Sequence, residues 1–253
     1  MLYYLYDKTF DGLLTCVFEA FSRKQQPDKI VSGDFALPMF SEAFTVITDE
    51  QKSERVSRAL AKKLSRSAME MLAVCYLAEM AEVEMAIFRY ASKAVVAPAS
   101  IEMNFADEDV LYLSKIYKKV TREEERMRQF VRFQKTADGM FFAVMEPLCN
   151  VLPLTAKYFQ SRFADQQWII YDARRRYGLY YDLQKVETVS FDNPETLINA
   201  ANLPQDKLDS AEIDFQNLWK DYLAAITIRE RHNPRLQQQF MPKRFWKYLV
   251  EKK

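Results

Sequence analysis

The hydrophobic side chains in the first half of the chain recur at helical spacing after one short β-favouring run. Residues 2–6, LYYLY, predict a strand, and Thr9 is suited to cap the helix that follows. The apolar positions of that helix obey the i, i+3, i+4, i+7 rule and are Phe10, Leu13, Leu14, Val17, Phe18 and Phe21. The chain is therefore predicted to open with a strand and an amphipathic helix.

Further along, up to residue 96, the pattern predicts a loop, one more strand and a set of helices. Proline and glycine residues indicate a loop over residues 25–41, and the run FTVIT at residues 44–48 favours a strand. Asp49 is a suitable cap for the next helix. Residues 67–94 are apolar on most sides, so at least part of this stretch is predicted to be a central helix.

In the second half of the chain, the pattern changes between helical and β-favouring runs. A helix over residues 107–120 and a charged helical turn over 122–128 precede two β-favouring runs at 129–135 and 140–146. The sequence TADG between these two runs suits a tight hairpin turn. The later predicted elements are a helix over residues 153–163, a hairpin over 168–182, a strand over 185–191 and a helix over 211–229.

Together these elements predict an α+β fold that is rich in helices. A small, mainly antiparallel sheet over residues about 129–191, joined by the strand at 2–6, is expected to pack against the helices. A chain of 253 residues can form a single domain, and it could divide into two lobes. These would be residues 1–128, mostly helical with the N-terminal strand, and residues 129–253, with sheet hairpins followed by C-terminal helices.

The amino-acid composition indicates the cellular compartment and argues against several kinds of site. Cys16, Cys75 and Cys149 are odd in number and far apart, which argues against a disulfide framework or a cluster site. A single histidine, His232, excludes a zinc site built from two or three histidines. The N-terminus does not resemble a signal peptide, and no apolar run approaches the roughly 18 residues of a membrane span. We therefore expect a cytoplasmic protein with no metal, cofactor or membrane partner.

Two basic and aromatic segments contrast with an almost neutral chain, in which 36 Lys and Arg balance 35 Asp and Glu. Residues 168–182, WIIYDARRRYGLYYD, contain three consecutive arginines, and residues 229–253 carry eight Lys and Arg against two Glu. Guanidinium groups bind phosphates bidentately, and aromatic rings stack on unpaired bases. The nucleic-acid-binding residues predicted on this basis are Trp168, Arg174, Arg175, Arg176, Tyr177, Arg235, Lys243, Arg244 and Trp246.

Structural roles are the alternative for both segments. In a regular strand, Arg174 and Arg176 would lie on one face and Arg175 on the other, so at least one arginine is expected to be structural. All three could instead be ion-paired surface residues, with the neighbouring aromatic rings in the core. The aromatic residues near the C-terminus could likewise close the core, with the Lys and Arg side chains facing water.

Asp172, His232 and the glutamate run at residues 123–125 are candidates for acid/base chemistry. Asp172 could act as a base or orient an arginine, although an aspartate at this place also suits a turn. His232 could act as a base, or it could simply end a helix. The run Glu123–Glu125 is interpreted as a solvated helix face, paired with neighbouring arginines.

Several stretches of the chain together resemble a bacterial family of DNA metabolism proteins, a domain of unknown function. They are YLYDKTFDGLLTCVFEAF near the start, FVRFQKTADGMFFAVMEP and NVLPLTAKYFQSRFADQQWIIYDARRRYGLYYD in the middle, and IRERHNPRLQQQFMPKRFWKYL near the end. Genes of that family are often found beside a gene for a radical SAM protein of DNA repair or modification. In some bacteria the domain is fused to a uracil-DNA-glycosylase-like domain. The resemblance spans nearly the whole chain, and it implies a setting without naming catalytic residues.

The expected function is that of a DNA-binding accessory protein. It would bind single-stranded or damaged DNA through its basic aromatic surface and work with a radical SAM partner. One alternative is a protein-interaction subunit that recruits or gates this partner without contacting DNA, with the acidic segment 192–217 in its interface. Another is an enzyme with an unrecognised site, which a deep pocket lined by Asp172, Arg176 and tyrosines would favour.

Overall fold

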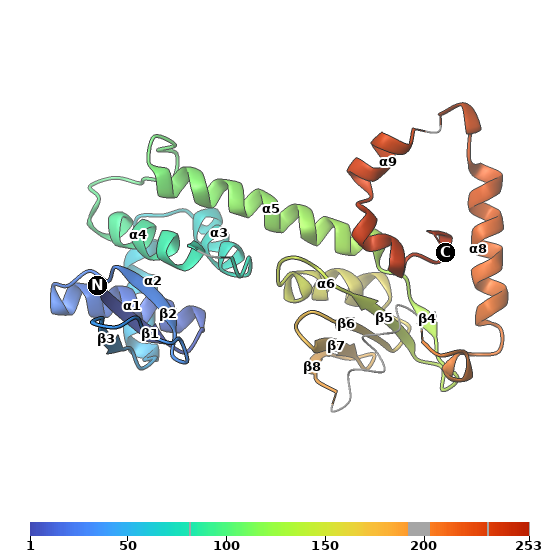
Figure 1. Cartoon of the computed structure of the whole chain (residues 1–253), viewed down its shortest axis with the longest axis horizontal. Coiled ribbons are helices and arrows are strands. Elements are labelled where there is room, and N and C mark those ends of the chain that lie inside the picture. Colours follow the sequence, from blue (N-terminus) through green and yellow to red (C-terminus); the bar gives the residue numbers. More distant parts are fainter. Residues whose placement is uncertain (81, 192–202, 232, 253) are drawn as a thin grey trace. The chain divides into compact units, whose positions relative to one another are not determined.

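The computed structural model describes residues 1–80, 82–191, 203–231 and 233–252 (Figure 1). It confirms the predicted α+β class, because two small sheets, of three and five strands, are packed with helices. Within the described ranges, none of the helices combines the length and the hydrophobicity that a bilayer-spanning segment needs.

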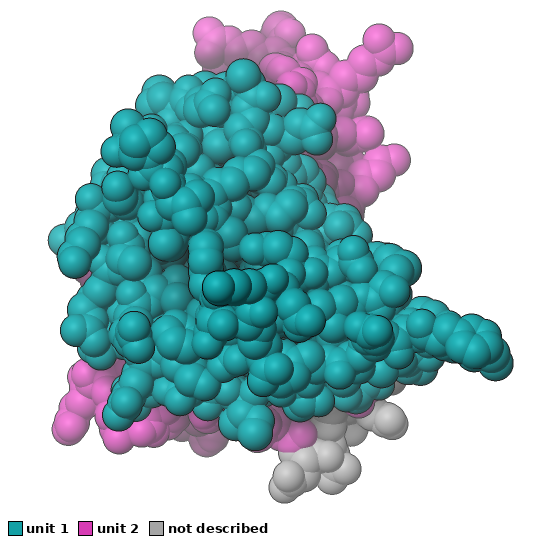
Figure 2. Space-filling view, turned by 90° about the vertical axis from the view of Figure 1, so that its left-hand side faces the viewer, with its two compact units in different colours: residues 1–121 teal, residues 122–253 magenta. Residues whose placement is uncertain are grey.

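The chain divides into two compact units, Met1–Thr121 and Arg122–Lys253 (Figure 2). We call them unit 1 and unit 2. Each contains one of the two sheets. The N-terminal strand was expected to join the later sheet, and this prediction was wrong, because the strand belongs to the sheet of unit 1. Its backbone groups are already paired on both sides within unit 1.

The sheet of unit 1 is parallel and has the order β2-β1-β3. Strand β1 (Leu2–Tyr6) is central, which confirms the strand predicted there. Strand β2 (Lys29–Ser32) lies inside the stretch predicted to be a loop, so that prediction was wrong. Strand β3 (Glu42–Thr45) begins two residues before the β-favouring run. A four-residue strand such as β2 is too short for periodicity to reveal, and its partner lies far away in sequence.

The helices of unit 1 begin where the capping residues indicate. Helix α1 (Phe10–Arg23) starts after Thr9, whose hydroxyl accepts a hydrogen bond from the backbone N–H of Gly12 at 2.9 Å. Helix α2 (Glu50–Ala61) starts after Asp49, which caps it in the same way. Both caps confirm the predictions made from the sequence.

The stretch predicted to contain a central helix forms two helices. They are α3 (Arg66–Tyr76) and α4 (Val83–Val96), and α4 buries most of its apolar side chains. Between these two helices, Glu79 and Glu82 adopt positive φ angles of 49° and 67°, which a right-handed helix does not contain. Helix α5 (Glu108–Phe130) then unites the predicted helix and the predicted charged turn in one element.

The sheet of unit 2 has the strand order β4-β5-β6-β7-β8 and is mainly antiparallel, as predicted. Its strands are β4 (Gln134–Lys135), β5 (Phe141–Met145), β6 (Trp168–Asp172), β7 (Tyr177–Tyr181) and β8 (Val186–Val189). Only the pair β5 and β6 is parallel within this sheet, and helix α6 (Leu152–Arg162) connects the two strands. Gly139, with a φ of 86°, occupies the predicted turn between β4 and β5.

The C-terminal part of unit 2 leaves the sheet through helix α8 and returns through α9 (Figure 1). Its elements are the 3-10 helix η1 (Gln205–Lys207), α8 (Glu212–Ile226), η2 (Arg229–Arg231), α9 (Pro234–Phe240), η3 (Lys243–Tyr248) and η4 (Val250–Lys252). Phe245, Tyr248 and Leu249 are buried and close the core of the unit. The structural alternative for these C-terminal aromatic residues is therefore correct.

The apolar side of α8 is largely exposed, although its helical spacing is typical of a buried face. Phe215 and Leu218 are 64% and 62% exposed, and Tyr222 and Ile226 are exposed as well. Trp219 is anchored through its indole N–H, which donates to Glu251 of η4 at 3.2 Å. The helix is thus anchored mainly along its first half, and its remaining apolar side chains face solvent.

A Gly178→Ala substitution is expected to destabilise the protein by about 1–3 kcal/mol, because no space exists for a side chain in this part of β7. A Cβ atom at Gly178 would lie 2.8 Å from the carbonyl oxygen of Ile170 in β6, and that oxygen is fixed by the strand. Gly33→Ala is the matched control, since its Cβ would lie 3.7 Å from the nearest atom. Urea unfolding followed by circular dichroism tests this, and equal losses in both variants would contradict it.

Candidate nucleic-acid interface

The three consecutive arginines lie in a turn and not in a strand. Strand β6 ends at Asp172 and β7 begins at Tyr177, so strand alternation does not apply to the residues between them. The carboxylate of Asp172 accepts hydrogen bonds from the backbone N–H groups of Arg174 and Arg175, at 2.9 and 3.1 Å. Arg176 completes the turn with a φ of 59°. The turn-forming alternative for Asp172 is therefore the correct one.

Arg175 is the structural member of the three. Its guanidinium forms an ion pair with Asp172 at 2.8 Å and donates to the carbonyl oxygens of Pro147 and Leu148, at 3.1 and 3.2 Å. The Arg175 side chain is only 10% exposed, and Asp172 is fully buried. Burial raises the pKa of Asp172 above its ordinary value, while the hydrogen bonds from Arg175 and the backbone oppose this shift. This contact fixes the turn against the segment that follows β5.

Arg174 reaches the C-terminal segment, where a concave basic surface forms. We call this surface the basic pocket. It has a volume of about 400 Å³, and the residues that line it are Glu146, Leu148, Arg174, Lys243, Arg244 and Lys247. Three of the residues predicted to bind nucleic acid therefore meet here, although the hairpin turn and η3 lie far apart in sequence. Arg174 is held at the pocket by a hydrogen bond of 3.4 Å to the carbonyl oxygen of Leu148.

Two of the four cations in the basic pocket are engaged by carboxylates. Lys247 pairs with Glu146 at 2.6 Å, and this contact, with the charge of Arg174, lowers the pKa of Glu146. Arg244 makes two hydrogen bonds to Glu123 of α5, one of them at 2.6 Å. Arg174 and Lys243 form no salt bridge within the described part of the chain, although the charge of Arg174 also acts on Glu146. These two cations are therefore available to an anionic ligand.

Glu123 is buried, so the prediction of a solvated face for the glutamate run was wrong at this residue. Its side chain is 3% exposed and accepts from the backbone N–H of Leu148 at 2.9 Å, as well as from Arg244. Burial alone would raise its pKa, but these hydrogen bonds and the charges of Arg244 and Arg126 hold it below the ordinary value. A residue 121 positions away supplies the main partner, which helical spacing could not reveal.

The other predicted binding residues lie outside the basic pocket. Trp168 is fully buried, with its ring 6.1 Å from that of Phe159 and 5.5 Å from that of Tyr181. It is a core residue, and its prediction as a stacking platform was wrong because strand β6 faces the core at this position. The hydroxyl of Tyr177, which is half-buried, donates to Asn150.

The remaining predicted residues are Trp246, Arg176 and Arg235. Trp246 is half-buried, its indole N–H donates to the carbonyl oxygen of Met241 at 3.0 Å, and Lys243 lies 5.9 Å from its ring. Arg176 and Arg235 are exposed and do not line the basic pocket. His232, the other candidate for acid/base chemistry, lies outside the described residues.

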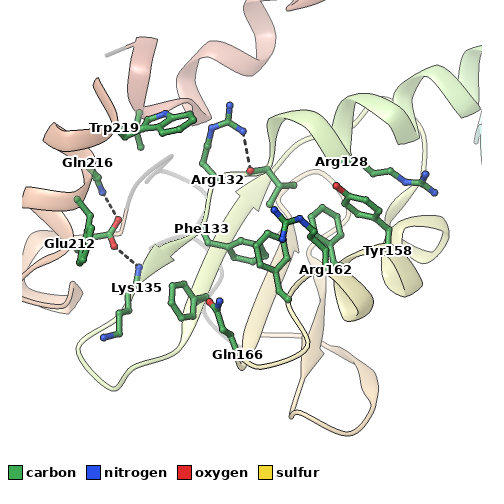
Figure 3. A pocket seen from close by; sticks show the side chains of 16 residues that line it. Arg128, Arg132, Phe133, Lys135, Tyr158, Arg162, Gln166, Glu212, Gln216 and Trp219 are labelled. Carbon is green, nitrogen blue, oxygen red and sulfur yellow. Dashed lines mark hydrogen bonds between the residues drawn. The ribbon is translucent and has the colours of Figure 1, made fainter. Parts of the chain in front are cut away.

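A second cavity in unit 2, which we call the aromatic cleft, was not predicted. Its volume is about 810 Å³, and it lies between the sheet, α6 and α8 (Figure 3). Seven aromatic side chains line it: Phe133, Phe141, Tyr158, Phe159, Phe163, Phe215 and Trp219. So do four cations, Arg128, Arg132, Lys135 and Arg162.

The polar groups of the cleft are held by a small set of contacts. Arg132 pairs with Glu251 at 2.8 Å, and its guanidinium lies 5.7 Å from the ring of Trp219. Glu212, which is buried, accepts from the backbone N–H of Lys135 at 3.0 Å and from the side chain of Gln216 at 2.9 Å (Figure 3). These contacts join α8 to the sheet at the edge of the cleft.

The sequence features closest to the cleft are the apolar face of the helix predicted over residues 211–229 and the arginines of the charged turn at 122–128. The first received no functional role from the sequence, and the second is interpreted there as part of a solvated face. Arg162 at the end of α6 gave no separate indication. Within the described ranges, no group of three His, Cys, Asp or Glu side chains is arranged to hold a metal ion.

Comparison with known proteins identifies a family for this sequence. The family model described as domain of unknown function DUF4130 matches residues 81–251, which is more than half of the chain. No curated protein matches the sequence. A solved structure, the pGpG-specific phosphodiesterase PggH from Vibrio cholerae, is 12% identical and covers 89% of this chain and 98% of its own, with a TM-score of 0.35. A likeness of this strength carries no argument about fold or activity.

Proposed function

We propose that this chain, which belongs to the DUF4130 family of domains of unknown function, is a DNA-binding accessory protein of DNA metabolism. The observation that carries the proposal is the basic pocket, in which cations from the hairpin turn and from η3 surround one concave surface. A chain with a net charge of only +1 has no general excess of positive charge, so this clustering is local.

The ligand that fits the basic pocket best is a phosphate of a DNA backbone. Arg174 and Lys243 form no salt bridge among the described residues, and both can donate several hydrogen bonds to phosphate oxygens. Lys247 and Arg244 add positive potential at the same surface, although Glu146 and Glu123 partly neutralise them. Such contacts position a nucleic acid without reading its sequence.

The partner in this proposal is a radical SAM protein of DNA repair or modification. The support for it is the sequence resemblance described above, and it concerns the setting in which the protein works. In this setting, the DUF4130 chain would hold the DNA while the chemistry takes place on its partner.

Replacing Arg174 and Lys243 together by alanine is expected to weaken the binding of single-stranded DNA and to reduce its salt dependence. Each lost phosphate contact lowers the slope of log K against log[salt] by roughly 0.7 for a single strand, so the slope should fall by about 1.4. Filter binding of a labelled oligonucleotide over a series of salt concentrations measures both effects.

The matched control removes the same charge elsewhere. Lys62 and Lys185 are exposed and lie outside the basic pocket, so the Lys62→Ala, Lys185→Ala double variant should keep the slope of the unmodified protein to within measurement error. If both double variants lose the same slope, the basic pocket is not the binding surface. If the unmodified protein binds DNA without salt dependence, the proposed function is wrong.

A second candidate function is a protein-interaction subunit that recruits or gates the partner without contacting DNA. The observation that favours it is the exposed apolar side of α8, together with Leu236 and Phe240 of α9, which are 50% and 67% exposed. The acidic segment expected in this interface lies partly outside the described residues. Co-purification with the partner in the presence of nuclease, combined with absent DNA binding, would favour this function over the first.

An enzyme with an unrecognised site receives less support from the geometry. The sequence predicted that a pocket lined by Asp172 and Arg176 would favour it. Neither residue lines the basic pocket or the aromatic cleft, and the carboxylate of Asp172 is committed to the hairpin turn.

A further inference from the structure

We infer that the aromatic cleft binds an unpaired nucleobase together with its phosphate, so that the ligand of this protein is a single strand and not an intact duplex. This inference rests on the proposed function, because it names the form of DNA that the protein binds. The cleft lies wholly within unit 2 and is separate from the basic pocket, with no lining residue in common.

The size of the cleft suits one nucleotide. Its volume of about 810 Å³ is within the range of pockets that bind small organic ligands, roughly 300–1,000 Å³. Its walls are rich in aromatic side chains, as expected for a site that holds a flat, weakly hydrated group. A base within a duplex has both faces covered by its neighbours, so only an unpaired base can present a face to such walls.

Rings accessible for stacking are present on both sides of the cleft. Trp219 of α8 is 37% exposed and Phe215 is 64% exposed, and on α6 Tyr158 is 37% exposed. Arg128 lies 5.1 Å from the ring of Tyr158, and Arg132 lies 5.7 Å from that of Trp219. Aromatic rings combined with arginines are the usual means by which proteins hold single strands.

A cation for the phosphate is available at the same place. Three of the four cations in the cleft form salt bridges: Arg128 with Glu124, Arg132 with Glu251, and Lys135 with Asp209. Arg162, at the end of α6, is exposed and has no carboxylate partner among the described residues. It lines the cleft beside its own neighbour Phe163, so a phosphate attached to a stacked base would lie within its reach.

Polar groups that could bind the edge of a base also line the cleft. The Nε–H of Arg132 is buried and has no acceptor in the described structure. Gln216 and Gln166 contribute side-chain amides, which both donate and accept hydrogen bonds. An apolar helix of a partner protein would leave these groups and Arg162 unsatisfied, and we therefore favour a nucleotide as the occupant.

The test uses Trp219 as the reporter and the full chain as the protein. Titration with oligo(dT) should quench tryptophan emission, whereas a hairpin duplex of the same length should not. Trp219→Leu should weaken oligo(dT) binding about tenfold, because a stacking face is lost. Trp219→Phe should retain most of the affinity but lose the quenching. Circular dichroism of each variant shows whether its fold is preserved.

The outcomes separate this inference from the proposed function. If Trp219→Leu binds oligo(dT) normally while the Arg174 and Lys243 double variant does not, the inference is wrong and the proposed function stands. If the unmodified protein binds neither single strands nor duplexes, both are wrong. If a duplex binds as tightly as oligo(dT), the cleft does not bind an unpaired base. The same conclusion follows if Trp219→Leu weakens the binding of a partner protein but not that of oligo(dT).

Discussion

An Asp172→Ala variant will lose about 3–5 kcal/mol of the free energy of unfolding, which is the largest effect we expect from a single substitution in this chain. The carboxylate of Asp172 is fully buried and forms an ion pair with Arg175 at 2.8 Å. It also accepts from two backbone N–H groups of the turn. Its removal leaves a guanidinium that is 10% exposed without its charge partner. A natural domain has only about 5–15 kcal/mol in total, so the variant will be close to unfolding.

Tryptophan emission during urea unfolding measures this effect in unit 2 alone. The three tryptophans of the chain, Trp168, Trp219 and Trp246, all lie between residues 122 and 253. Asp172→Asn is the informative control, because one oxygen remains to accept from the turn while the negative charge is lost. Its loss should lie between that of Asp172→Ala and zero. A stable Asp172→Ala variant would show that the turn does not depend on this carboxylate.

A Glu123→Gln variant will lose about 3 kcal/mol near neutral pH and less in acid. The value is at the lower end for a buried pair because Arg244 is 28% exposed. The folded pKa of Glu123 lies below its ordinary value of 4.5, so the ionised carboxylate stabilises the folded protein above that pH. As the pH falls from 4.5 through the folded pKa, the unmodified protein loses this contribution, and the two proteins should converge.

Urea unfolding of both proteins at pH 7 and at steps below pH 4.5 measures the difference. Glu125→Gln is the matched control, since it removes the same charge from an exposed position of the same helix. It should leave the free energy of unfolding within about 0.5 kcal/mol of the original value. A Glu123→Gln loss that stays constant over this pH range would contradict the assigned role of the carboxylate.

Elements that depend on local interactions could be predicted from the sequence. Thr9 and Asp49 cap α1 and α2 as expected, because a cap acts on a backbone N–H only three residues away. The turn at Gly139 and the hairpin of β6 and β7 were predicted for the same reason. Strand β2 and the assignment of β1 to its own sheet could not be, because strand pairing depends on contacts between distant segments.

The candidate site could be predicted only in part, and the reasons are again physical. Clustered charge led to the prediction of Arg174, Lys243 and Arg244 as binding residues, and these three line one pocket. Clustering could not tell which arginine of the turn is committed to the core, since Asp172 selects Arg175 through three-dimensional geometry. Nor could it reveal the aromatic cleft, whose walls come from β4, α6 and α8. A buried ring and a cleft-lining ring have the same spacing along a helix.

The long-range position of the Glu123 and Arg244 contact has a consequence for the lifetime of unit 2. The strands β4 to β8 each pair with a neighbour in sequence order, so the sheet can assemble through mostly short chain closures. The contact between α5 and η3 closes a loop of 121 residues, which carries a large loop-closure cost. Interactions that form after the transition state slow unfolding and leave the folding rate almost unchanged. We therefore expect the contact of Arg244 to form late in folding and to affect how long unit 2 stays folded more than how fast it folds.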